Sequence, residues 1–205
     1  MAIKRHLIHL NGNQLCAIDT ETTGLKAGYH EVIQLALLPL DANLEPYLKI
    51  PPFDIYILPE YPNRAEPEAI RKLGISRWAL VLEQGIPQEK AIEIFESWFE
   101  RLGIEEKSIT PLAQNWPHDS AFLKHFFGGE NFNRYFHGHY RDTMSTASYL
   151  NDRADFNVEQ TPFAKIGLSS LANRLGIEID GKLHDALYDA KVTAQVYKKM
   201  LLEPF

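Results

Sequence analysis

The chain has 205 residues, of which 45% are hydrophobic and 23% are charged, a composition typical of a soluble globule with a full core. Disordered, collagen-like and coiled-coil proteins are therefore excluded. Because 21 basic side chains face 27 acidic ones, the formal net charge is −6, which argues against a protein that holds nucleic acid through bulk positive charge. No apolar run reaches membrane-spanning length, and the single Cys16 cannot form an internal disulfide, so we expect a cytoplasmic protein.

The first part of the chain predicts three strands in succession. Residues 14–18 form a short apolar run that stops at Asp19. A second strand is expected over residues 31–40, and a weaker third strand over residues 48–58, where two prolines interrupt the pattern. Strands that follow one another in this way are typical of an antiparallel meander.

From residue 67 onward the apolar residues recur with the spacing of an α-helix. Short helices are expected over residues 67–73 and 76–84, each bounded by glycine or proline. A longer helix is expected from Pro87 to Gly103, and its apolar face consists of Ala91, Ile94, Phe95, Trp98 and Leu102.

The second half of the chain alternates strands and helices. The expected elements are a strand at 108–114, a helix at 117–127, a strand at 140–142, and helices at 143–149, 167–176 and 185–202, with a loop at 151–165. The last helix has an apolar stripe made of Leu187, Ala190, Ala194, Tyr197 and Leu201. This order predicts one α/β domain over residues 1–205, with a mixed sheet covered by helices and a helical segment at about 60–107.

The sequence Asp19-Thr20-Glu21-Thr22-Thr23-Gly24-Leu25 directly follows the first apolar strand. Because side chains alternate along a strand, Asp19 and Glu21 project to the same side, with Cα atoms roughly 6–7 Å apart. Two carboxylates placed in this way can converge on one cation. A bare Asp-x-Glu would more simply be a pair of polar residues at a strand end, but here a specific Thr-Thr-Gly-Leu turn follows it.

This stretch resembles the first motif of the DEDD 3′–5′ exonucleases, the DnaQ-like proofreading family with a ribonuclease H-like fold. In that family a second motif supplies an Asn and, four residues later, an Asp at the start of a helix. Asn115 and Asp119 match this spacing. The match departs from the family at His118, where an aromatic residue is usual, and at Gln114, where a His is common. Taken alone, Asp119 would be read as a helix-capping residue.

A third stretch, His184-Asp185-Ala186-Leu187-Tyr188-Asp189, has a His five residues before an Asp. The His-type branch of the DEDD family has this arrangement, whereas the Tyr-type branch places a Tyr four residues before the Asp. Taken alone, His184 would be a structural or solvent-facing residue, and Asp185 would be a helix cap. The resemblance extends from Leu15 to about Leu202 and implies a ribonuclease H-like five-stranded mixed sheet with helices on both faces.

The resemblance also implies a site and a mechanism. Asp19, Glu21, Asp119 and Asp189 offer only hard oxygen ligands, which suit two Mg²⁺ or Mn²⁺ ions, and in the family the first Asp bridges both ions. His184 would take the proton of the attacking water. Hydrolysis at a 3′ end would then release nucleoside 5′-monophosphates.

Four residues are candidates for substrate contacts. The resemblance places Thr22 and Leu25 at the terminal nucleotide, where Leu25 would wedge against a base; packing in the core is an equal alternative for Leu25. Asn115 belongs to the second motif, and Trp116 beside it is the best candidate for stacking on a base. Most other aromatic residues between 116 and 140 are expected in the core.

Together these features predict a metal-dependent 3′–5′ exonuclease, similar to DNA polymerase III epsilon, that acts on single-stranded 3′ ends of DNA or RNA. One alternative is an exoribonuclease for RNA tails or short oligoribonucleotides. Another is a non-catalytic binding or subunit module of the same fold, against which the five retained site residues argue. No membrane partner is expected, while a homodimer and a polymerase or repair partner stay open.

Overall fold

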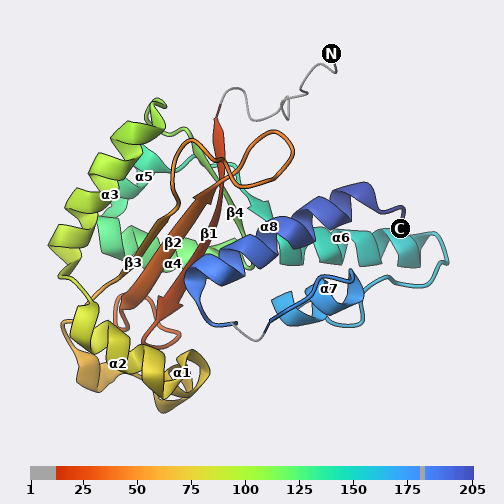
Figure 1. Ribbon diagram of the computed structural model, residues 1–205. Helices are drawn as coiled ribbons and strands as arrows, with labels where there is room; N and C mark the ends of the chain where they lie inside the picture. The colour runs from red at the N-terminus through yellow and green to blue at the C-terminus, as the bar shows by residue number, and fades with distance from the viewer. Residues whose placement is uncertain (1–12, 181–182) are drawn as a thin grey trace.

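In the computed structural model, which describes residues 13–180 and 183–205, a sheet lies between helices (Figure 1). Its strands are β1 (Gln14–Thr22), β2 (Val32–Pro39), β3 (Phe53–Tyr56), β4 (Ile109–Ala113) and β5 (Arg141–Asp142). The helices are α1 (Pro67–Leu73), α2 (Ile75–Gln84), α3 (Gln88–Leu102), α4 (Trp116–Phe127), α5 (Gly129–Tyr135), α6 (Thr143–Phe156), α7 (Leu168–Arg174) and α8 (Ala186–Leu202), with a 3₁₀ turn, η2 (Pro62–Arg64). None of the described helices is both long and apolar enough to cross a membrane.

The five strands have the order β3-β2-β1-β4-β5. Strands β1, β2 and β3 pair antiparallel, as the expected meander requires. Strands β4 and β5 are parallel to β1, and each is reached through an intervening helical segment. The predicted mixed five-stranded α/β sheet is confirmed.

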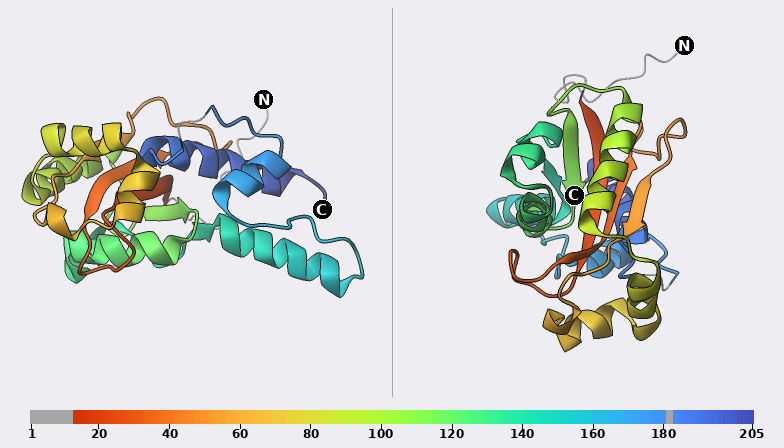
Figure 2. Two further views of the ribbon diagram at one scale, coloured as in Figure 1. Left: turned by 90° about the horizontal axis from the view of Figure 1, so that it is seen from below. Right: turned by 90° about the vertical axis from the view of Figure 1, so that its left-hand side faces the viewer.

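Helices cover both faces of this sheet. Cys16 and Ile18 of β1 belong to the core that α3 and α4 share, whereas Leu15 and Ala17 pack with residues of α8. The alternation of side chains along β1 therefore assigns each of its residues to one helical layer. Figure 2 shows the sheet between α8 on one side and α4 on the other.

Helix α8 is buried on two sides. Ala190 and Ala194 contact the sheet, while Val192, Val196 and Met200 form a second core with α6 and α7. This double burial fixes the start of α8 relative to the sheet edge, which matters for the site described below.

Two strands differ from the expected ranges. Strand β1 does not stop at Asp19 but continues to Thr22, because pairing with the fully buried strand β2 extends along it. Strand β3 is shorter than expected and begins only after Pro51 and Pro52, which have no N–H group to offer a neighbouring strand.

The helical part differs in three places. Helix α6 continues to Phe156, so the first residues of the expected 151–165 loop are helical, because Leu150 and Ala154 are buried. Helix α5 was not expected; Phe132 and Tyr135 attach it to the core. Leu201, assigned to the buried stripe of α8, is 51% exposed, because the sheet does not reach the last turn of that helix.

Candidate active site

The carboxyl-terminal part of β1 carries Asp19 and Glu21 on the face that α8 covers. These two residues continue the alternation of Leu15 and Ala17, which pack with α8 residues. Both lie within the paired part of the strand, opposite Ala36 and Gln34 of β2. The regular pairing thus aims both carboxylates toward the first turns of α8.

Helix α4 brings a third carboxylate to the same end of the sheet. Asn115 occupies the N-cap position with a left-handed backbone (φ 69°), and Asp119 follows in the first turn, 3% exposed. The Thr20 hydroxyl, between the two acidic residues of β1, donates to Oδ1 of Asp119 at 2.7 Å. This bond ties α4 to β1 at the acidic pair.

The start of α8 adds the fourth carboxylate and a histidine. Asp185 caps the helix through a bond from the Tyr188 amide, as the sequence indicated. His184 has a left-handed backbone (φ 66°), and its amide donates to Oδ2 of Asp189 at 3.2 Å. Ligand atoms of Glu21, His184 and Asp189 all lie within 4.8 Å of one another.

Two residues that hold this arrangement together were missed in the sequence. Arg77 of α2 donates from Nη1 to the carbonyl oxygens of Leu183 and His184, at 3.0 and 2.7 Å. Its Nε lies 3.8 Å from Asp185. Arg77 therefore holds the backbone that presents the histidine, and no local sequence pattern marks a contact 107 positions away.

Gln34 is the second residue that was missed. It lies in the apolar strand β2, is 1% exposed, and accepts a hydrogen bond from the Ala186 amide at 3.1 Å through Oε1. Its Nε2 donates to Asp54 at 2.9 Å. A buried glutamine in an otherwise apolar strand is the signal that could have indicated this role, since buried polar groups need partners.

Crowding of carboxylates perturbs their protonation. Burial is the main cause that raises the pKa of Asp19 well above its usual range, and the neighbouring Asp119 and Glu21 add to it. Burial also raises the pKa of Glu21 to about 8, of Asp119 to about 7 and of Asp189 to about 6. The metal-free site thus favours bound protons, as expected where anionic oxygens lie close together.

These residues fit a divalent cation. Four carboxylates supply hard oxygen ligands of the kind that Mg²⁺ and Mn²⁺ prefer. Oδ1 of Asp189 is buried and has no hydrogen-bond partner among the described residues, so a ligand position is available there. A cation would replace the protons that the raised pKa values otherwise retain.

The environment of His184 lowers the pKa of its side chain, whereas the pKa values of the carboxylates are raised. Partial desolvation lowers the pKa of the His184 imidazole, and the cationic side chains of Lys72 and Arg77 lower it further. A neutral imidazole beside the acidic cluster can accept a proton near neutral pH.

A hollow of about 240 Å³ lies beside Glu21 and His184, lined in part by Thr22, Gly24 and Leu25. The Thr22 hydroxyl donates to the Gly24 carbonyl at 2.8 Å and so fixes the turn. Leu25 is 76% exposed, which excludes the core alternative for this residue. Its side chain is available to a ligand in the hollow.

Trp116 does not have the exposed position that base stacking needs. The residue is 5% exposed, and its ring stacks on Phe132 with centroids 6.2 Å apart. The ring packs in the aromatic cluster between α4 and α5. The prediction that Trp116 stacks on a base is therefore wrong, and the residue belongs to the core. Asn115 beside it is exposed.

The model of the exonuclease family (RNase_T) matches residues 16–197 of the chain. The chain belongs to this exonuclease family. The resemblance to DEDD exonucleases, drawn from three short motifs, is thereby confirmed over nearly the whole chain. No curated protein sequence gave a significant match.

Solved structures share the fold at low sequence identity. Cell-death related nuclease 4 (CRN-4) is 19% identical, with a TM-score of 0.69, over 92% of this chain and 64% of that one. E. coli exonuclease I in complex with a dT13 oligonucleotide is 20% identical, with a TM-score of 0.68, over 91% of this chain and 40% of that one. The nuclease domain of 3′hExo, a DEDDh family member bound to rAMP, is 20% identical, with a TM-score of 0.62, over 92% of both. The exonuclease chain thus spans less than two thirds of the first two proteins.

Proposed function

We propose that the protein is a metal-dependent 3′–5′ exonuclease that removes nucleoside 5′-monophosphates from single-stranded nucleic acid. The observation that carries the proposal is the convergence of Glu21, His184 and Asp189, whose ligand atoms lie within 4.8 Å of one another. Asp19 and Asp119 lie at the same end of the sheet. This set supplies both the anionic ligands and the base that phosphodiester hydrolysis needs.

The site residues have two tasks in the proposal, metal binding and proton transfer. Asp19, Glu21, Asp119 and Asp189 would hold two Mg²⁺ or Mn²⁺ ions, with Asp19 shared between them. When bound, two such ions supply Lewis-acid stabilisation of the attacking and leaving oxygens. A neutral imidazole nitrogen of His184 accepts the proton of the attacking water.

The 3′ end of the substrate would occupy the hollow beside Glu21. The exposed Leu25 would contact the terminal base, and the turn held by Thr22 would face the sugar. Asn115 is exposed at the start of α4 and would contact the nucleic-acid strand close to its 3′ end. Trp116 has no part in substrate binding because its ring is buried.

Two further facts support a single-stranded end as the substrate. The net charge of −6 offers little bulk attraction for a long duplex, so binding would depend on local contacts. Two of the similar structures, both of E. coli exonuclease I, are complexes with single-stranded DNA and with a dT13 oligonucleotide.

The direct test is nucleotide release from single-stranded DNA, duplex DNA and RNA, each labelled at the 3′ or the 5′ end, with Mg²⁺, Mn²⁺ or a chelator. We expect early release of a 3′ label as a mononucleotide, fastest from single strands and only with a metal. Asp19→Ala should abolish release while circular dichroism shows a folded protein. Metal-independent release, early loss of a 5′-terminal label, or full activity of Asp19→Ala would contradict the proposal.

A further inference from the structure

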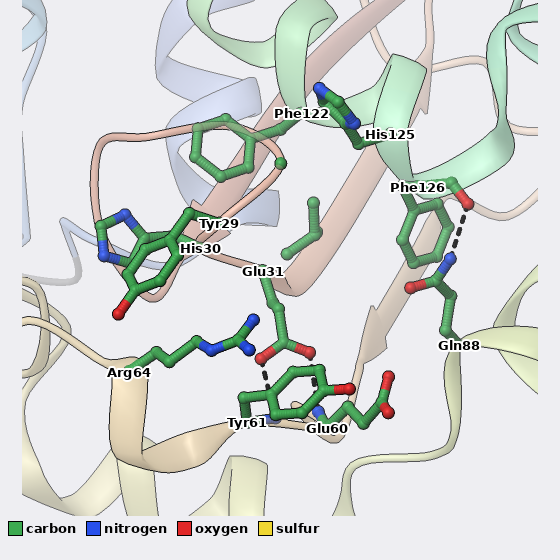
Figure 3. Close-up of a pocket in the computed structure, with 12 residues that line it drawn as sticks. Tyr29, His30, Glu31, Glu60, Tyr61, Arg64, Gln88, Phe122, His125 and Phe126 are labelled. Carbon is green, nitrogen blue, oxygen red and sulfur yellow. Dashed lines mark hydrogen bonds between the residues drawn. The ribbon is translucent and has the colours of Figure 1, made fainter.

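Two exposed tyrosines and an arginine form a cluster beside the turn that follows β1. Tyr29 is 45% exposed and Tyr61 is 40% exposed. The Arg64 guanidinium carbon lies 3.8 Å from the ring centroid of Tyr61 and 5.1 Å from that of Tyr29. Figure 3 shows these three side chains at one hollow, and we call them the Tyr29–Arg64–Tyr61 cluster.

Neighbouring residues hold the two tyrosines in place. The carboxylate of Glu31 accepts hydrogen bonds from the amides of Glu60 and Tyr61, at 2.7 and 2.9 Å (Figure 3). His30, directly after Tyr29, is 8% exposed, and its Nδ1 accepts a bond from the Lys26 amide at 3.0 Å. Both rings are therefore attached to backbone that is already ordered, which lowers the entropy cost of binding a ligand.

The cluster also carries two cations, Arg64 and Lys26, although the carboxylates of Glu31, Glu60 and Glu66 line the same hollows. Within the described part of the chain, neither Arg64 nor Lys26 forms an ion pair with a carboxylate. The Lys26 ammonium lies 5.7 Å from the centroid of the Tyr29 ring. Aromatic faces combined with cationic side chains are the usual means of holding single-stranded nucleic acid, since bases stack on the rings and phosphates pair with the charge.

The cluster adjoins the proposed active site. Tyr29 and Arg64 line a second hollow together with Glu66, and Glu66 also lines the hollow that contains Thr22 and Leu25. The Glu66 amide donates to the Thr23 carbonyl at 2.7 Å, which joins the two regions through the backbone. A strand whose 3′ end lies against Leu25 can thus continue along this surface.

We propose that the Tyr29–Arg64–Tyr61 cluster is a subsite for a nucleotide upstream of the scissile bond, with its base stacked on a tyrosine and its phosphate near Arg64 or Lys26. This inference rests on the proposed exonuclease function. The subsite adds affinity for strands that are long enough to reach it and takes no part in the chemical step.

The test compares Tyr29→Leu, Tyr61→Leu and the double variant with the wild type. Fluorescence anisotropy measures binding of oligothymidylates of two and eight nucleotides to proteins that also carry Asp19→Ala. We expect the double variant to bind the octamer about 5- to 100-fold more weakly, with a much smaller change for the dimer. Tyr149→Leu, at a 63% exposed tyrosine of α6, is the matched control. It should bind both oligothymidylates as tightly as the protein with Tyr149 unchanged.

Nucleotide release by the same tyrosine variants, now with Asp19 unchanged, gives a second readout. In the double variant the KM for the octamer should rise with little change in kcat. Tyr29→Phe keeps an aromatic face, so its KM should stay close to that of the wild type, unlike that of Tyr29→Leu. Equal length dependence in the wild type and the double variant, or equal losses for dimer and octamer, would overturn the subsite. If no oligonucleotide is cleaved but the binding difference persists, the proposed activity fails and the subsite stands.

Discussion

His184 combines an unusual backbone with a side chain at the centre of the site. His184 has a φ of 66° and lies just before Asp185, the N-cap of α8, while its imidazole lies with Glu21 and Asp189. If this group accepts the proton of water, His184→Ala should lower kcat roughly 10²- to 10⁴-fold in a nucleotide-release assay. The melting temperature should hardly change, because the residue is exposed. His139→Ala, at another exposed histidine, is the control, and a similar kcat for both variants near pH 7 would remove His184 from this role.

Arg77 acts on the reaction through the backbone of His184. Without its bonds to two carbonyl oxygens, the imidazole would sample several positions, so Arg77→Ala should lower kcat about tenfold or more. The decisive measurement is the double variant. Because Arg77 acts through the histidine, the double variant Arg77→Ala/His184→Ala should have nearly the same kcat as His184→Ala alone. Independent, multiplicative losses would indicate that Arg77 acts elsewhere.

Leu25 is the most exposed apolar side chain lining the candidate hollow, at 76%. An apolar contact with a base removes this surface from water, so Leu25→Ala should weaken binding of a single-stranded 3′ end about tenfold. The thermal midpoint should stay within about a degree, since little core packing is lost. Leu48→Ala, at a 97% exposed leucine, controls for general surface effects. A large fall in stability with unchanged binding would contradict the contact role.

At the scale of elements, Gln34 links the central sheet to the start of α8. Gln34→Ala would leave the Ala186 amide without its partner, which should cost about 1–3 kcal/mol in the free energy of unfolding. It should also lower kcat, because Asp189 lies in the first turn of that helix. Chemical denaturation and nucleotide release measure the two effects. Gln160→Ala, in an exposed loop, is the control, and equal stability of the two variants would refute the link.

Features that arise within one helix or strand could be predicted from the sequence, whereas contacts between distant elements could not. The strands and the long helices follow from local periodicity, and the five candidate site residues were predicted from short motifs of the family that the chain resembles, which the structure brings to one end of the sheet. The contacts of Arg77 and Gln34 connect positions more than 100 residues apart, and no local pattern encodes them. The burial of Trp116 also depends on a contact that no local pattern encodes. Helix α5, which covers its ring, has no clear apolar period of its own.

For the whole molecule, the acidic balance and the site are connected. The net charge of −6 includes four carboxylates gathered at one end of the sheet. Two divalent cations would change the formal charge to about −2 and would concentrate positive charge where a phosphate must bind. An acidic protein can therefore hold a nucleic-acid end locally, whereas the Tyr29–Arg64–Tyr61 cluster would extend the contact along a single strand.

The same carboxylates couple stability to pH, and they would couple it to a bound metal. Folding raises the pKa of Asp189 to about 6, of Asp119 to about 7 and of Glu21 to about 8, above the ordinary value near 4 for such groups. Their protonated forms stabilise the metal-free fold below about pH 4, and this contribution is lost as the pH rises through the folded pKa values. Bound cations would need the ionised forms and would offset the loss.

The rise in melting temperature that Mn²⁺ produces over a chelator should therefore grow between pH 5.5 and pH 8, because protons compete with the cation at the lower pH. Differential scanning fluorimetry at fixed ionic strength measures it. Glu21→Gln removes one titrating ligand, so its metal-dependent rise should be smaller and should vary less with pH. Glu83→Gln, on the exposed surface of α2, should behave as the wild type. If the rise were equal at both pH values in the wild type, protons and metal would not share these carboxylates.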